Sequence, residues 1–112
     1  MEVIQPPDWA RPKGYSNGII ATGKMFFVAG QVGWNKEEEF ETDDFCGQAR
    51  QALTNIKDIL TAGGAGPEHM CRMTWYIGDK DEYNGCLGDL GKVYQEIMGK
   101  NFPVMTGIQV AG

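Results

Sequence analysis

A polar and aromatic segment that follows an apolar run is the part of this sequence best suited to forming a binding site. Residues 25–29 read MFFVA, and residues 30–35 read GQVGWN. A strand that ends at a glycine and leaves polar and aromatic groups at its end commonly forms the floor of a pocket. Residues 14–18 (GYSNG) form a second glycine-rich polar segment upstream. We therefore expect a small-molecule pocket to be built from these two segments.

The other reactive side chains do not form a recognisable catalytic or metal site. His69 is the only histidine, and no cysteine pair accompanies it. Ser16 is the only serine, and no base can be assigned to activate it. The acidic run at residues 37–39 (EEE) is typical of a solvated loop rather than of metal ligands. We expect neither a metal nor a cofactor.

Length and composition predict one domain over residues 1–112. With 112 residues and 42% hydrophobic content, the chain can bury one core and not two. No apolar run is long enough for a membrane span, and no signal segment begins the chain, so we expect a cytoplasmic protein. Cys46, Cys71 and Cys86 form neither a CxxC pair nor a metal spacing, which is typical of reduced thiols.

The net charge argues against nucleic acid as a partner. The formal charge is −5 at pH 7, and the sequence pI is about 4.7. Affinity for a phosphate backbone comes largely from lysine and arginine contacts, and this chain would repel such a backbone. We therefore expect no binding to nucleic acid.

Hydrophobic periodicity in the first half of the chain predicts two strands and a helix. The segment through Trp9 is rich in proline and polar residues and is expected on the surface. Residues 16–21 and 24–31 are expected to pair as an antiparallel hairpin. Residues 43–61 form the most regular helical pattern, with Thr42 or Asp43 as its cap and Gly63 and Gly64 at its end.

The second half predicts strand, helix and strand. Residues 70–77 read as a central strand because of their β-branched and aromatic content. A helix is expected over residues 81–98, although its glycines favour a frayed or broken first turn over a smooth packing face. Residues 104–110 form the last expected strand. The order predicts an α+β fold with both helices on one face of a sheet. The apolar stripe of the second helix is expected at Tyr83, Leu87, Leu90, Tyr94, Ile97 and Met98.

Several segments in this order resemble the Rid family, also called the YjgF family, many of whose members are described as enamine/imine deaminases. Besides the two glycine-containing segments, the resemblance extends through residues 48–56 (QARQALTNI), residues 72–77 (RMTWYI), Asp79, Lys80 and Tyr94. It implies one mixed, mainly antiparallel sheet with two helices on one face, a chorismate mutase-like arrangement. It also implies a homotrimer that binds a small metabolite in each cleft between subunits.

The resemblance also identifies site positions. Tyr15 corresponds to the residue that closes the cleft in active relatives, although packing within a Gly-Tyr turn is an equal alternative. Gly30 and Gln31 match the family's strand end, whereas Ala29 replaces a small hydroxyl residue there. Sequences of the family continue past the position of Gly112 into a final strand, which carries a glutamate that assists the attack of water on the imine. The chain is therefore expected as a Rid-like domain that is shortened at its C-terminus, either natively or as a fragment.

One departure from the family bears directly on activity. In active relatives an arginine after Phe-Pro binds the substrate carboxylate through paired donors, and water attacks the imine carbon to release a keto acid and ammonia. This sequence reads FPVMTG at residues 102–107, so Met105 stands at the arginine position. We expect Tyr15, Ala29, Gly30, Gln31 and Met105 to line the substrate site. No catalytic residue is assigned.

Two classes of function remain open. The first is a Rid-type hydrolase or deaminase of a small imine or enamine metabolite with altered specificity, in which the cleft accepts an imine or carbonyl compound that lacks a carboxylate. The second is a non-catalytic trimer that binds a small ligand or serves in regulation. Arg50 and Arg72 are not expected to replace the missing arginine, because neither is expected to point into the cleft.

Overall fold

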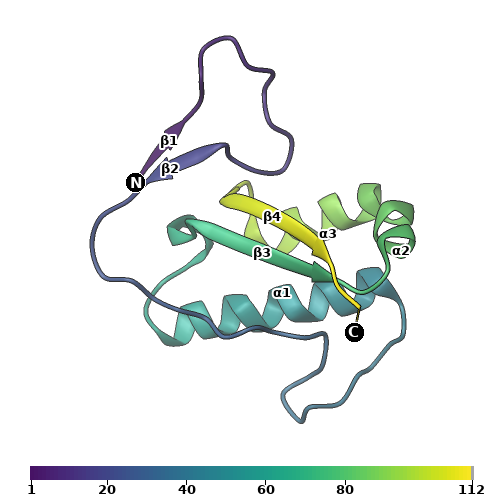
Figure 1. Cartoon of the computed structure of the whole chain (residues 1–112). Coiled ribbons are helices and arrows are strands. Elements are labelled where there is room, and N and C mark those ends of the chain that lie inside the picture. The colour runs from purple at the N-terminus through teal and green to yellow at the C-terminus, as the bar shows by residue number, and fades with distance from the viewer. Residues whose placement is uncertain (112) are drawn as a thin grey trace.

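The computed structural model describes residues 1–111 and has an α+β fold. Figure 1 shows a small hairpin at the N-terminus and a second pair of strands that lies against the helices. The strands are β1 (Glu2–Ile4), β2 (Gly18–Ile20), β3 (Arg72–Ile77) and β4 (Val104–Gln109). The helices are α1 (Phe45–Ala62), the short 3-10 helix η1 (Pro67–His69), α2 (Lys80–Gly85) and α3 (Leu87–Met98).

Helix α1 forms close to its predicted bounds. Its cap is Asp44, whose carboxylate accepts a hydrogen bond from the backbone N–H of Gly47 at 2.8 Å. Thr42 supports the cap by accepting a bond from the backbone N–H of Asp44 at 3.0 Å. The prediction that Thr42 or Asp43 itself caps the helix is therefore wrong. Gly63 ends the helix as expected, and its N–H bonds to the last carbonyls of α1.

The second predicted helix is divided in two. A break at Cys86 separates α2 from α3. The first turn itself is intact and is capped by Asp79, so the expected interruption occurs, but one turn later than predicted. A side-chain carbon added at Gly85, Gly88 or Gly91 would meet nothing within 4 Å, so these glycines form no close packing face. The expected stripe is buried at Leu90, Tyr94 and Met98. Leu87 is exposed instead, and Val93 is buried in addition.

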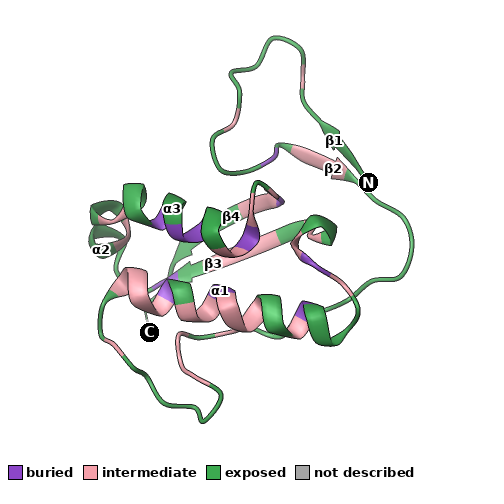
Figure 2. Cartoon of the chain, turned by 180° about the vertical axis from the view of Figure 1, so that it is seen from behind, coloured by how far each residue is buried: buried purple, intermediate pink, exposed green. Residues whose placement is uncertain are grey.

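Strands β3 and β4 are parallel, and their register sets two different faces. Met73 pairs with Met105, and both side chains pack against the helices. Alternate residues such as Tyr76 and its partner Ile108 point to the opposite face and are exposed. Figures 1 and 2 show α1 and α3 on the same side of this pair, behind the strands in Figure 1 and in front of them in Figure 2. The expectation that both helices cover one face is confirmed.

The core lies between these two helices and the β3–β4 pair. Its buried members all come from α1 and α3 and are Leu53, Val93, Tyr94 and Met98. Partly buried apolar side chains from the strands and loops pack around them, namely Ile56, Met70, Met73, Trp75, Ile97, Phe102 and Met105. Burial of this apolar surface is the main term that favours the fold.

The expected single sheet is not formed within the described residues. The strands make two separate pairs, β1 with β2 antiparallel and β3 with β4 parallel. β3 has a partner on one side only, so its predicted central position is also wrong.

The predicted strand over residues 24–31 is also absent, because β2 pairs with β1 instead. Met25 and Phe27 are 77% and 81% exposed, so this segment has β-forming residues without a strand partner. The N-terminal segment, expected as irregular surface chain, contributes β1. No helix formed by the described residues is both long and apolar enough to span a membrane.

The cap of α1 gives a direct test of the helix start. Asp44→Ala removes the acceptor for the Gly47 N–H and should lower the free energy of unfolding by about 1 kcal/mol. Asp43→Ala is the matched control, because Asp43 is exposed and does not cap the helix, and it should change stability by less than about 0.5 kcal/mol. Urea unfolding followed by circular dichroism measures both. An equal loss in the two variants would contradict the assignment of the cap.

Candidate functional site

The structure fixes Tyr15 beside the start of β4. Its neighbour Ser16 is buried, donates its backbone N–H to the carbonyl of Pro103 at 3.0 Å, and forms an isolated parallel bridge with Val104. The Ser16 hydroxyl also donates to the carbonyl oxygen of Phe102 at 2.5 Å. Tyr15 itself remains 42% exposed. The only serine is therefore an anchor for the chain, and its hydroxyl proton is already engaged.

Met105 belongs to the helix-covered face of the β3–β4 pair. It is partly buried and packs against the core cluster. Because side chains alternate along a strand, Val104 and Thr106 point to the opposite face. The thioether that stands at the expected arginine position is thus part of the packing under the sheet.

Ala29, Gly30 and Gln31 lie in the long connection between β2 and α1. The Gln31 side-chain amide donates to the carbonyl of Ala29 at 3.2 Å, which keeps that amide within its own segment. Across residues 1–111, no hydrogen bond joins these three residues to Tyr15 or Met105. Hydrogen bonds within a single chain therefore do not join the five expected site residues into one site.

The residues that follow Gln31 hold this connection against α1. Asn55 donates its side-chain amide to the carbonyls of Val32 and Trp34, at 3.3 and 2.9 Å. A side-chain carbon added at Gly33 would lie 2.7 Å from the Cα atom of Gln48, so only glycine permits this approach. The GQVGWN segment is thus positioned by a helix and not by a sheet.

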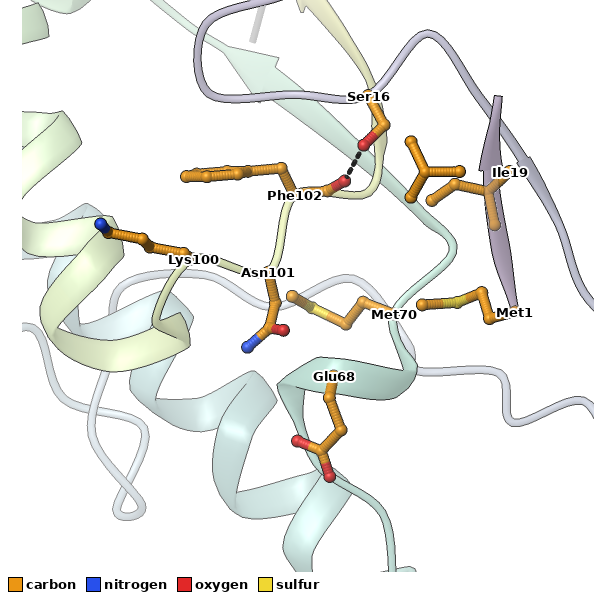
Figure 3. A pocket seen from close by; sticks show the side chains of 9 residues that line it. Met1, Ser16, Ile19, Glu68, Met70, Lys100, Asn101 and Phe102 are labelled. Carbon is orange, nitrogen blue, oxygen red and sulfur yellow. Dashed lines mark hydrogen bonds between the residues drawn. The ribbon is translucent and has the colours of Figure 1, made fainter. Parts of the chain in front are cut away.

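A cleft of about 170 Å³ lies between the N-terminal hairpin and the start of β3 and β4. Figure 3 shows Met1 and Ile19 on one side of it and Met70 and Phe102 on the other. Sequence reasoning missed this cleft because it left residues 2–4 out of any strand. The complete lining is Met1, Val3, Ser16, Ile19, Glu68, Met70, Lys100, Asn101 and Phe102.

The polar groups of this cleft are largely engaged elsewhere. Ser16 donates to Phe102, and the Asn101 side-chain amide donates to the carbonyl of Met98 at 2.7 Å. Figure 3 shows the charged ends of Glu68 and Lys100 pointing away from the apolar side chains of the cleft. The cleft therefore suits a small neutral or apolar group better than a carboxylate.

The two arginines considered as replacements differ in availability. Arg50 on α1 forms a salt bridge with Glu96 on α3, with 2.6 Å between Nη1 and Oε2, and is thereby committed to the helix surface. Arg72 is exposed and begins β3, where it pairs in register with Val104. Because Ser16 bridges to the same Val104, Arg72 lies across β4 from the anchor of Tyr15.

Tyr94 supports the loop that leads into β4. Its hydroxyl donates to the carbonyl oxygen of Asn101 at 2.5 Å, and its ring stacks on Phe102 with 5.6 Å between centroids. Burial raises the pKa of Tyr94 above its ordinary value, which keeps the phenol protonated as a donor. The same loop contributes Asn101 and Phe102 to the cleft, so Tyr94 holds two of the residues that line it.

Comparison with known sequences identifies a group of related proteins. The profile of the family described as Endoribonuclease L-PSP matches residues 9–112. A RutC family protein from Pyrococcus horikoshii is 31% identical over 111 residues, which cover 98% of this chain and 85% of that protein. The human 2-iminobutanoate/2-iminopropanoate deaminase is 24% identical over 98 residues, which cover 87% of this chain and 68% of that protein.

Solved structures agree with the sequence relatives. YyfB of the conserved Rid protein family, from Yersinia pestis, superposes with a TM-score of 0.72 at 26% identity, covering 97% of this chain and 86% of that one. The YjgF protein from E. coli gives a TM-score of 0.66 at 27% identity, covering 87% and 75%. The resemblance drawn from the residues is confirmed, and so is the α+β class of the fold.

The raised pKa of Tyr94 predicts a pH dependence of stability. The unfolded chain releases the phenol proton near pH 10, while the folded chain retains it. The contribution of Tyr94 to the free energy of unfolding is therefore fully present below pH 10 and falls above it, by at most about 1.4 kcal/mol per pH unit. Tyr94→Phe should remove this decline and lower stability at neutral pH by about 1 kcal/mol. Urea unfolding between pH 7 and pH 11 measures both effects.

The control for this experiment is Tyr83→Phe, because this change keeps the ring that packs against Phe45 and removes only the hydroxyl. This variant should keep both the stability at neutral pH and the decline above pH 10. A decline of equal slope in Tyr94→Phe and wild type would refute the role given to Tyr94.

Proposed function

Because this chain belongs to the Rid family, described by its profile as Endoribonuclease L-PSP, we propose that it is a Rid-type hydrolase with altered specificity. Its substrate is a small imine or enamine metabolite that lacks a carboxylate. Relatives named 2-iminobutanoate/2-iminopropanoate deaminase support this reaction class. The family description also names a ribonuclease, but a chain with a net charge of −5 is poorly suited to bind RNA, and we propose no nucleic-acid partner.

The observation that carries the altered specificity is the position of Met105. A thioether offers neither charge nor paired donors, and this one packs against the core. A substrate carboxylate would lose an interaction of roughly 2 to 4 kcal/mol without a partner at this position. The ordinary substrates of the family, which are carboxylate imines, are therefore expected to react slowly or not at all.

A non-catalytic role is the second candidate. The cleft beside β1 and β2 is mostly apolar, and its Ser16 hydroxyl and Asn101 amide are already hydrogen-bonded. Such a cleft favours holding a small ligand over activating water, because activation needs a free base or donor. A ligand-binding or regulatory trimer would use the same surface without turnover.

We further propose that residues 1–112 act as one Rid-like domain in a cytoplasmic homotrimer. The face of the β3–β4 pair opposite the helices carries exposed apolar groups, among them Tyr76 at 70% and Ile108 at 42% exposure. A subunit packed against this face would bury them. Assembly also offers a way to bring Ala29, Gly30 and Gln31 of one chain toward β4 of its neighbour, in an intersubunit cleft.

The hydrolysis of 2-aminoacrylate tests the proposed function. The purified protein is added to enzymatically generated 2-aminoacrylate, and hydrolysis is scored by its competition with semicarbazide trapping. We expect no acceleration with the carboxylate substrate, but acceleration with an imine of similar size that lacks the carboxylate. Hydrolysis of neither compound by an assembled oligomer would favour the binding role, and rapid hydrolysis of 2-aminoacrylate would contradict the altered specificity.

Substitution at position 105 examines the cause of that specificity. Met105→Arg restores a bidentate donor but also places a charge beside the core, so it should lower the free energy of unfolding and, in the folded protein, increase hydrolysis of 2-aminoacrylate by 10-fold or more, from the interaction estimated above. Met105→Leu keeps the volume and the packing and should leave hydrolysis unchanged. Circular dichroism checks that both variants are folded. No gain in a folded Met105→Arg trimer would place the cause of low activity elsewhere in the cleft.

The assembly is tested at the open face of the β3–β4 pair. Light scattering should give three times the 12.4 kDa mass of one chain for the wild type and a lower mass for Ile108→Glu. Leu87→Glu is the matched control, because Leu87 is similarly exposed, at 49%, but lies on α3. A wild-type monomer, or equal loss of assembly in both variants, would reject this interface.

A further inference from the structure

Two cysteines that are far apart in the sequence lie together in the fold. Cys46 is in the first turn of α1, and Cys86 is at the break between α2 and α3. The Cys46 Sγ atom lies 3.7 Å from the carbonyl oxygen of Cys86. Both cysteines are half-buried, and neither takes part in a disulfide. The Cys46 thiol therefore lies against the backbone of Cys86, at the contact between the first helix and the interrupted second one.

Independent contacts hold these two backbone segments together. Phe45, next to Cys46, packs edge to face against Tyr83 of α2, with 5.9 Å between ring centroids. The N–H of Cys86 bonds to the carbonyl of Tyr83 at 3.1 Å, and the carbonyl of Cys86 accepts the N–H of Leu90 at 2.7 Å. The approach of Cys46 to Cys86 is thus fixed by an aromatic contact and by the hydrogen bonds that end α2 and begin α3.

The surroundings of Cys86 also allow a small adjustment of the backbone. Side-chain carbons added at Gly85 or Gly88 would meet nothing within 4 Å, so this junction has free space around it. A disulfide needs Cα atoms about 4.4 to 6.8 Å apart and a defined torsion about the sulfur bond. A glycine on each side of the Cys86–Leu87 step lets the junction reach that geometry without disturbing the core.

We propose that Cys46 and Cys86 form a reversible intramolecular disulfide that ties the start of α1 to the junction of α2 and α3. The third cysteine is elsewhere, since the Cys71 Sγ atom lies 3.6 Å from Met1 Sδ and 3.7 Å from the carbonyl of His69. The proposal does not depend on the enzymatic or binding role of the chain.

The order of reaction follows from the environment of Cys46. Burial, and after it the neighbouring Cys86 thiol, raise the pKa of Cys46 to about 12, and the carboxylates of Asp44 and Asp89 act in the same direction. Because the thiolate is the nucleophile in disulfide exchange, Cys46 is a poor first attacker at neutral pH. Cys86 reacts first, and Cys46 completes the bond.

The oxidant is a small-molecule disulfide of the glutathione type. The Cys86 thiolate attacks one sulfur of that disulfide, its sulfur–sulfur bond breaks, and the first small thiol leaves and takes up the proton that Cys86 lost. Cys46 then loses its proton and attacks the Cys86 sulfur, which expels the second small thiol with that proton. Two protein thiols are oxidised, and one small disulfide is reduced to two thiols.

Thiol counting on the full chain tests the proposal. The reduced protein is equilibrated with glutathione buffers of increasing oxidised fraction, alkylated, and weighed intact. Labels should fall from three, one for each cysteine, to one, and peptide mapping should find residues 46 and 86 joined. The oxidised form should melt roughly 5 to 15 °C higher than the reduced form, and dithiothreitol should reverse both changes.

Single variants distinguish this bond from other thiol chemistry. Cys71→Ala should form the same crosslink, with no label left after oxidation. Cys46→Ala should retain a mixed disulfide with glutathione at Cys86 and show no rise in melting temperature of the size seen in the wild type. Three labels at every buffer ratio, a crosslink through Cys71, or crosslinks only between chains would overturn the proposal.

Discussion

The register of the β3–β4 pair is the constraint on which the rest of the structure depends. Since side chains alternate along each strand, this register places Met73 and Met105 together under the helices and leaves Tyr76 and Ile108 on the outside. A slip by one residue would exchange the two sets and expose the apolar groups that complete the core. The packing of α1 and α3 therefore presupposes this one alignment of strands.

The same register explains why the residue in the family's arginine position does not stand in an open pocket. Position 105 faces the helices, where the methionine packs against the buried core cluster. Arg72 directly precedes Met73 on β3 and therefore points to the opposite, exposed face of the strand pair. A residue at position 105 can either bind a substrate or complete the core, and in this chain Met105 completes the core.

Local patterns in the sequence predicted the elements whose stability is mostly local. The long amphipathic run gave α1 within about two residues, and the glycines at 85, 88 and 91 indicated the break before α3. Local patterns did not predict which distant segments pair as strands. Residues 25–29 have β-forming side chains, but whether they join a sheet depends on which strand lies beside β2, and β1 takes that place. The cleft beside the hairpin was missed for the same reason.

The attachment of the N-terminal hairpin has a consequence for motion. In Figure 1, β1 and β2 lie apart from the helices, and the buried Ser16 joins their segment to β4 through Pro103 and Phe102. β1 is exposed along its whole length, and none of the buried core residues comes from either strand. We therefore expect the hairpin to unfold locally as a separate unit, so that its amide hydrogens exchange with solvent faster than those of α1 and α3. Opening it would change the cleft without cost to the core.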